Sequence, residues 1–394
     1  MMGGSGPETA RVKGARMKFS LFYPVTVGSA DRLGTGLLGL EPQLYGSAIA
    51  ELREQAVAAD ETGWHSLMLA ERHFEVEGYQ VTPNPLLLNV YLAQHTARLR
   101  HGQLGLAVPT WNPLRLAEDI AVADHLTGGR LDVGLSHAVP ARAGGVLGQH
   151  HRGAENREIF EEWFEVMRMA WTEELWSYEG AHIQVPPPGI AWRHPVSERL
   201  GAGVEDGALT RIGTVPRPLQ SPHPPLYTVL TGGDETVEWA ARVGSTLVTT
   251  ATEPGRIRRV AETYAEAANR HGRNVYLNRW EPGGGIALCR FLAVAPTHEE
   301  ALRTGRQALP YVRDWLAGFG LFDGRPRTLD ELVADGAMLL GTPERVGEQV
   351  RCLADEHGID HLIFVACTGS ADHGRMLETI AAFGEEIIGR LSPA

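Results

Sequence analysis

The chain has 394 residues, of which 43% are hydrophobic and 21% charged, and its formal net charge is -12 at pH 7. This composition is typical of a globular protein, and the acidic balance without a basic run argues against nucleic acid or anionic lipid as a partner. The three cysteines are too scattered for a disulfide framework or a zinc site. We therefore expect a reducing, cytoplasmic setting and no metal.

Residues 1–16 are rich in glycine and are followed by no apolar segment of the kind found in signal peptides. We interpret them as a disordered extension that precedes one domain, residues 17–394. No stretch of about 18 uncharged apolar residues occurs in the chain, which excludes a membrane-spanning helix.

From Met17 onward, short apolar runs alternate with longer helical patterns, an order typical of parallel strands joined by crossover helices. The predicted strands are residues 18–23, 66–70, 103–108, 131–136, 226–230, 245–250, 286–295 and 361–366. The predicted helices include residues 47–63, 85–96, 113–126 and 155–171, and Thr342 would cap the helix before the last strand. The pattern predicts an α/β fold, a (β/α)8 TIM-type barrel. A doubly wound sheet is disfavoured, because no glycine-rich fingerprint follows the first strand.

Two long connections interrupt this rhythm: an insertion at 178–225, before strand five, and a loop at about 316–340, after strand seven. Loops of this length in a compact domain are more often functional covers than simple connectors. We predict that the first, whose ends are rich in proline and whose middle is rich in glycine, is a mobile lid over the open end of the barrel. The second is the next candidate for that role.

Ligands of parallel barrels bind at the carboxyl ends of the strands, where this chain places several polar residues. These are Glu71, Arg72 and His73 after strand two, Ser136 and His137 after strand four, and residues 232–236 after strand five. The glycines of the last turn let the backbone approach a ligand, and the helix that starts at Asp234 offers free N–H groups to an anion. This turn is a candidate phosphate site, with an ordinary capped glycine turn as the alternative.

Several of these segments resemble bacterial luciferase and its relatives, and they occur in the order of that family. They are ERHF (71–74), VPTWNPLRLAED (108–119), GGRL (128–131), TVEWAA (236–241) and GTP (341–343). The resemblance implies a barrel, a homodimer and an FMN-dependent monooxygenase that acts on paired donors and incorporates one oxygen atom. A separate flavin reductase would supply the reduced FMN, and O2 would form a C4a-peroxyflavin that oxygenates a small organic substrate.

The resemblance also suggests where the cofactor and the substrate bind. It places the flavin phosphate against Gly233 and Thr236, with Arg157 as a cationic partner that can bind it bidentately. A solvated helix position is the alternative for Arg157. The remaining predicted cofactor-binding residues are Leu104, Gly105, Ser136, His137 and Gly232. The predicted substrate-binding residues are Trp111, Asn112 and Phe22, with core packing as the alternative for Trp111.

The chain departs from luciferase at two candidate positions. Luciferase has two histidines after the strand-two glutamate, whereas this chain has Arg72 and then His73, so aldehyde chemistry and light emission are not carried over. The family's phosphate-binding arginine after strand four is His137 here, which predicts a weaker or pH-dependent anion site.

Glu71, Arg72 and His73 are the candidate catalytic residues. A fixed guanidinium at Arg72 would stabilise the anionic, nucleophilic form of the peroxide and so favour Baeyer–Villiger attack on a carbonyl. An ion pair across the dimer is the alternative for Arg72. The resemblance places His73 near the subunit contact, where it would meet Glu118 of the partner subunit, so catalysis and an interchain contact both stay open.

Two competing functions share the expected fold. One is hydride transfer by a deazaflavin-dependent oxidoreductase, which the Glu-Arg-His-Phe segment disfavours. The other is a non-catalytic flavin-binding partner subunit, which Arg157 and the intact glycine turn disfavour. The identity of the substrate does not follow from the sequence.

Overall fold

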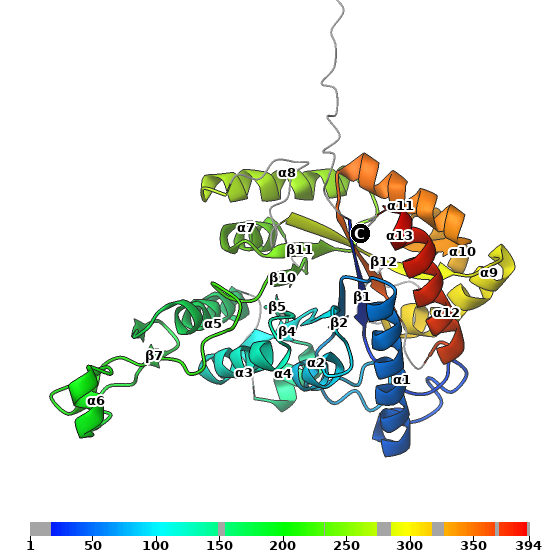
Figure 1. Cartoon of the computed structure of the whole chain (residues 1–394). Helices are drawn as coiled ribbons and strands as arrows, with labels where there is room; N and C mark the ends of the chain where they lie inside the picture. The colour runs from blue at the N-terminus through cyan, green and yellow to red at the C-terminus, as the bar shows by residue number, and fades with distance from the viewer. Residues whose placement is uncertain are drawn as a thin grey trace, which may run out of the picture.

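The computed structural model describes residues 17–148, 154–231, 233–273, 285–316, 327–366 and 370–391. Within these ranges, eight parallel strands form a ring in the order β1, β2, β3, β5, β10, β11, β12 and β14 (Figure 1). Pairing of β14 with β1 and of β10 with β5 closes the ring. The predicted (β/α)8 barrel is therefore confirmed.

The ring strands are β1 (Lys18–Tyr23), β2 (Ser66–Leu69), β3 (Arg100–Gln103), β5 (Leu131–Ser136), β10 (Leu226–Val229), β11 (Thr246–Thr249), β12 (Gly285–Val294) and β14 (His361–Val365). A short β4 (Leu106–Ala107) follows β3 after a cis peptide bond between Leu104 and Gly105. The third strand thus begins at Arg100, three residues before the predicted start. The first residues of β3 are polar, so the pattern of apolar residues did not indicate them. Arg100 is stabilised at this position by an ion pair of 2.7 Å with Asp132. An unpredicted strand, β13 (Met338–Gly341), pairs with the second half of β12.

Helices surround the barrel (Figure 1). They include α1 (Pro42–Glu61), α2 (Pro85–Ala93), α3 (Pro113–Leu126), α5 (Ala154–Thr172), α7 (Asp234–Val243), α8 (Pro254–Arg270), α9 (His298–Gln307), α10 (Leu329–Ala334), α11 (Pro343–His357) and α12 (His373–Phe383). Helix α1 begins five residues before the predicted Ser47, because Pro42 supplies a favourable first helical residue. Among the described helices, none combines the length and apolar composition needed to cross a membrane.

Two apolar clusters lie on the two faces of the ring. The larger one packs between the strands and the helices. The smaller one fills the barrel interior with Met68, Leu104, Tyr227, Val248, Ala287, Cys289 and Ile363. Phe22, Val229 and Val365 pack against the interior cluster from the last two positions of their strands. These side chains make the apolar floor of the barrel mouth.

The insertion between α5 and β10 runs beyond α5, and its outer part with α6 (Pro195–Leu200) projects away from the barrel (Figure 1). It also contains β6 (Tyr178–Glu179), β7 (Gln184–Val185), β8 (Val204–Glu205) and β9 (Ala208–Leu209). The predicted long insertion is confirmed, and its role as a lid over the mouth stays a prediction. A helix that follows a barrel strand runs back to the amino ends of the strands, so the segment after α5 starts at the end opposite the mouth.

The second candidate lid, the loop predicted at about 316–340, contains α10 and the start of β13 in its described part and also includes residues 317–326. These lie outside the described residues, as does the predicted extension at residues 1–16. The lid role of this loop stays a prediction.

His101 on β3 is expected to make the fold sensitive to acid. Burial, reinforced by the nearby Arg130, lowers the pKa of His101 to about 3. In the unfolded chain a histidine titrates near pH ~6.5. Below that pH the unfolded state binds a proton that the native state does not, so the free energy of unfolding falls as the pH drops from about 6.5 towards 3.

We predict that His101→Gln removes this contribution, which amounts to about 1.4 kcal/mol per pH unit where the difference in bound protons is one. Urea unfolding of both proteins between pH 7 and pH 4.5 measures it. His95→Gln, at an exposed position after α2, is the matched control and should keep the wild-type slope. Equal slopes in His101→Gln and wild type would contradict the prediction.

Candidate active site

The first turns of α5 and α7 meet at the carboxyl end of the barrel. Nη2 of Arg157 donates a hydrogen bond of 2.8 Å to Oγ1 of Thr236, and the Arg157 side chain is only 18% exposed. Helix α7 begins after Gly233, which provides no side-chain cap for the first N–H groups of the helix. An uncapped helix start beside a mostly buried guanidinium is a site with the charge and the donors for a phosphate. Gly232 lies outside the described residues.

Two carboxylates that were not among the predicted site residues also face Arg157. Oε2 of Glu235 lies 3.7 Å from its Nε, and Oε1 of Glu161 lies 4.0 Å from its Nη1. Glu235 is 80% exposed, so its side chain can turn into solvent when an anion binds. The sequence held a signal for Glu161, because it follows Arg157 by four residues on one helix face.

His137 and Ser136 end β5 beside this site. The His137 ring lies 5.9 Å from the ring of Phe160 on α5, in an edge-to-face arrangement. Burial lowers the pKa of His137, the Arg157 charge adds to this, and Glu161 and Glu235 act in the opposite direction. His137 is therefore neutral near pH 7 and offers a hydrogen bond in place of a positive charge. Oγ of Ser136 accepts a hydrogen bond from its own turn, at the backbone N of Ala138.

Glu71 organises a second cluster at the mouth. The residue is 1% exposed, and Oε2 accepts the backbone N–H of Ala107 at 2.9 Å. Oε1 accepts the indole N–H of Trp111 at 3.1 Å and contacts Nε2 of His73 at 2.8 Å. A carboxylate only accepts, so the hydrogen of the last contact belongs to Nε2. Three donors thus converge on one buried acid.

The other two candidate catalytic residues, His73 and Arg72, contact different atoms of Glu71. His73 is 18% exposed and faces Glu71 of its own chain, which leaves Nδ1 as the nitrogen not engaged by Glu71. Nη1 of Arg72 donates to the backbone oxygen of Glu71 at 2.7 Å. In the described part of the chain, no carboxylate lies within 4.0 Å of the Arg72 guanidinium.

Trp111 and Asn112 follow η2 (Val108–Thr110) at the top of α3. Trp111 is held at both ends, because its indole binds Glu71 and its backbone oxygen accepts a hydrogen bond of 2.8 Å from Nε1 of Trp163 on α5. Oδ1 of Asn112 accepts hydrogen bonds from the backbone N–H groups of Leu114 and Arg115, so this oxygen caps the start of α3. The Trp163 contact was not predicted, since nothing in the sequence relates two tryptophans 52 residues apart.

Phe22, Leu104 and Gly105 lie on the floor of the mouth. Leu104 belongs to the interior cluster and Phe22 packs against it. A Cβ on Gly105 would lie 3.1 Å from backbone atoms of Gly134 and Leu135, closer than ordinary contacts. Gly105 thus lets its backbone lie close against that of β5.

A further contact at the mouth, also not predicted, joins the loop after β2 to α4 (Ala141–Val146). Arg142 makes two hydrogen bonds to the Glu77 carboxylate, of 2.8 and 2.7 Å, and a third, of 2.8 Å, to the backbone oxygen of Phe74. The bond from Arg142 is the main reason why the pKa of Glu77 is lowered. This contact fixes the loop that carries Glu71 and His73.

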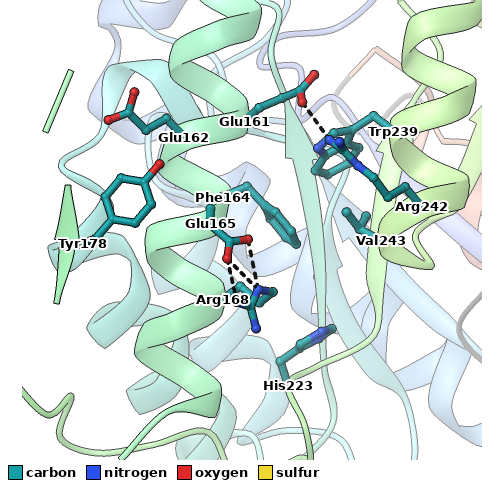
Figure 2. A pocket seen from close by; sticks show the side chains of 10 residues that line it. All are labelled: Glu161, Glu162, Phe164, Glu165, Arg168, Tyr178, His223, Trp239, Arg242 and Val243. Carbon is teal, nitrogen blue, oxygen red and sulfur yellow. Dashed lines mark hydrogen bonds and ion pairs between the residues drawn. The ribbon is translucent and has the colours of Figure 1, made fainter. Parts of the chain in front are cut away.

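A cavity of about 620 Å³ lies between α5 and α7 and shares Glu161 with the Arg157 cluster (Figure 2). It is lined by Glu161, Glu162, Phe164, Glu165, Arg168, Tyr178, His223, Trp239, Arg242 and Val243. Figure 2 shows two ion pairs within the groove, of 2.6 Å between Arg168 and Glu165 and of 2.7 Å between Arg242 and Glu161. It contains none of the predicted site residues, so we place the active site at the barrel mouth.

A TIM-type barrel whose mouth combines an open helix start, a shielded arginine and an apolar floor is typical of cofactor-binding enzymes. The luciferase-like monooxygenase family model matches residues 17–361. The chain therefore belongs to the luciferase-like flavin monooxygenase family and is an oxidoreductase of that family.

Two curated relatives illustrate the range of the family. An uncharacterized protein of Sinorhizobium fredii is 26% identical over 349 residues, 85% of this chain and 90% of that protein. The oxygenase component of the flavin-dependent trigonelline monooxygenase of Acinetobacter baylyi is 29% identical over 213 residues. That alignment spans 54% of this chain and 48% of the relative.

Two solved structures share the fold. The oxygenating constituent of 3,6-diketocamphane monooxygenase from Pseudomonas putida, a type II Baeyer–Villiger monooxygenase in complex with FMN, has a TM-score of 0.73 at 20% identity. The superposition covers 96% of this chain and 100% of that chain. The coenzyme F420-dependent tetrahydromethanopterin reductase of Methanopyrus kandleri has a TM-score of 0.64 at 14% identity, with 96% and 100% covered. At these identities the likeness concerns the fold alone.

Proposed function

We propose that the chain is the oxygenase component of a two-component monooxygenase. It would take reduced FMN from a separate flavin reductase, use O2, and transfer one oxygen atom to a small organic substrate. The observation that carries this proposal is the contact between Arg157 and Thr236 at the uncapped start of α7. A phosphorylated cofactor needs such a seat, whereas a small uncharged substrate does not.

The residues at the mouth fit FMN. Arg157, Thr236 and the start of α7 would hold the phosphate, and the Gly105 backbone with the ring of Phe22 would support the isoalloxazine. When bound, reduced FMN supplies the electrons that activate O2. The described residues supply binding, orientation and charge around it.

Arg72 favours carbonyl substrates in this proposal. Its guanidinium is fixed by the backbone oxygen of Glu71 and has no carboxylate within 4.0 Å among the described residues. Such a charge would stabilise negative charge on the oxygen atom that is transferred, which makes the oxygen a nucleophile. Nucleophilic oxygen attacks carbonyl carbon, so we propose Baeyer–Villiger oxygenation of a ketone or an aldehyde. The diketocamphane enzyme, with which this chain shares its fold, is of that type.

We also propose a homodimer through α2 and α3. The outer faces of these adjacent helices carry exposed apolar side chains, Leu87 and Tyr91 on α2 and Val122 and Leu126 on α3. Exposed apolar side chains grouped in this way are typical of an interface. In such a dimer Nδ1 of His73 would be available to Glu118 of the partner subunit.

Isotope labelling with two alternative cofactors tests the proposed reaction. We expect the chain, supplied with reduced FMN, to put one 18O atom from 18O2 into a product of cyclohexanone or of a bicyclic ketone. Reduced deazaflavin without oxygen should give no product. Anaerobic reduction of the ketone by the deazaflavin would establish hydride transfer instead. FMN binding without turnover of any ketone or aldehyde in a panel would favour a non-catalytic subunit.

A further inference from the structure

The insertion before β10 forms an arm, residues 178–211, that projects beyond α5 (Figure 1). Its two ends are joined at the base, because the Trp176 and Ile212 backbones pair with each other. The Glu162 carboxylate on α5 accepts the backbone N–H groups of His182 and Ile183, each at 3.0 Å. The arm is therefore anchored in a defined direction.

The outer part of the arm is ordered by local hydrogen bonds. The Ile190 oxygen accepts the N–H of Leu209 at 2.9 Å, and Nε1 of Trp192 donates to Oγ of Ser197 at 3.0 Å. Helix α6 is capped by His194 and ended by Gly201 in the left-handed conformation, yet none of its residues is buried. The tip has a fixed shape without a core of its own.

This tip presents large apolar side chains to solvent. They are Ile190, Trp192, Val196 and Leu200, and Leu200 is 71% exposed. An arm that exposes a tryptophan and three aliphatic side chains in a pre-formed shape is suited to bind another surface. It loses little conformational entropy on binding, because it is already ordered. The arm contains four acidic and three basic residues. Packing, rather than charge, would therefore dominate its contacts.

The segment that returns from the arm connects it to the exposed faces of α2 and α3. The Arg217 oxygen contacts Nε2 of His125 on α3 at 2.9 Å, and Leu219 lies against Gly129, just after α3. Val215 and Leu219 are themselves exposed on this segment, as Leu126 is at the end of α3. Exposed apolar side chains thus continue from α2 and α3 to the base of the arm.

We propose that the arm clasps a second copy of this chain, with Trp192 and Leu200 packed on the partner beside the α2–α3 contact. This inference extends the dimer of the proposed function. A stable interface buries about 800 Å² on each chain. The four exposed side chains of α2 and α3 supply only part of that area, because even a large aromatic side chain buries about 150–250 Å² when fully covered.

A twofold-symmetric partner also explains why both exposed apolar surfaces occur on one chain. In a twofold interface each chain presents the same surfaces to the other, so one dimer covers two arms and two α2–α3 faces at once. A flavin reductase bound at the arm would leave the α2–α3 faces exposed. The second copy is therefore the occupant that the described surface favours.

Sedimentation velocity over a dilution series, without flavin, tests the arm. We expect Leu200→Glu to raise the dimer dissociation constant at least tenfold, because a charge would be buried in the contact. The matched control is Leu40→Glu in η1 (Leu38–Leu40), where Leu40 is 62% exposed before α1. It should leave the constant within threefold of wild type. Equal constants for the two variants, or a wild type that is monomeric at micromolar concentration, would overturn the proposal.

A photo-crosslinking amino acid at position 192 gives a second measurement that does not depend on the stability of a variant. In a mixture of isotopically heavy and light chains, we expect heavy-to-light crosslinks from the arm. Crosslinks only within one chain, or only to added flavin reductase, would overturn the clasp. FMN affinity is measured separately. Loss of the dimer in Leu200→Glu without FMN binding in any variant would refute the proposed function and leave the clasp standing.

Discussion

We expect Glu71→Gln to lower the free energy of unfolding by about 2–4 kcal/mol and the rate of oxygenation at least a hundredfold. A glutamine amide has one oxygen and one NH2 group, whereas Ala107, Trp111 and His73 all direct donors at the present carboxylate. The NH2 group would face at least one of these donors. The loss of a buried, fully engaged acceptor then costs both stability and the shape of the mouth.

Glu77→Gln is the matched control for this variant. Glu77 lies in the same loop after β2 and is also hydrogen-bonded, but its partner is Arg142 and its side chain is 31% exposed. A half-exposed ion pair of this kind is worth about 1 kcal/mol or less. Glu77→Gln should therefore stay close to wild type in stability. Chemical denaturation and 18O incorporation measure both effects.

The two readouts separate a positioning role of Glu71 from direct proton transfer. With Oε1 and Oε2 engaged by donors of the chain, we propose that Glu71 acts through Trp111 and His73. Fluorine-labelled tryptophan NMR should then show a shifted Trp111 resonance in Glu71→Gln. A hundredfold rate loss with unchanged stability and an unchanged Trp111 signal would contradict positioning and favour acid-base catalysis.

The alternation of strands and helices was predictable because each element has a local pattern of apolar and polar residues. Strand β5 and helix α3 have the bounds predicted for them, since a run of buried residues and a helical period with Pro113 at its start are both local signals. The start of β3 was missed because Arg100 owes its place to Asp132, 32 residues later. Patterns read along the chain do not contain such pairings.

The candidate site likewise contains some contacts that could be predicted from the sequence and others that could not. The resemblance drew attention to Arg157 and Thr236, and the structure brings these two side chains into contact. It did not indicate that Glu235 competes for the same guanidinium, or that Glu71 holds Trp111. The direction of the arm did not follow from the sequence for a topological reason: a long segment after a barrel helix begins on the side of the barrel away from the mouth.

Arg157→Ala is expected to weaken FMN binding by about 1.5–3 kcal/mol, roughly a ten- to 150-fold rise in the dissociation constant. The reason is the loss of a charge-assisted hydrogen bond from a guanidinium that is shielded from water and already aimed at the start of α7. Fluorescence or calorimetric titration with FMN measures it. The thermal midpoint checks that the fold is intact.

Two further variants separate a phosphate contact from a general change in charge. Arg242→Ala removes an arginine that pairs with Glu161, as Arg157 does, but Arg242 lies in the last turn of α7, so FMN affinity should stay within threefold of wild type. Glu235→Gln removes the exposed carboxylate 3.7 Å from Arg157 and should tighten binding by a factor of about two to five, because a phosphate would no longer displace it. A phosphate that binds at Arg157 predicts a large loss of affinity in Arg157→Ala together with no loss in Arg242→Ala. If Arg157→Ala and Arg242→Ala weaken FMN binding equally, the effect is one of net charge, and the phosphate site must be sought elsewhere at the barrel mouth.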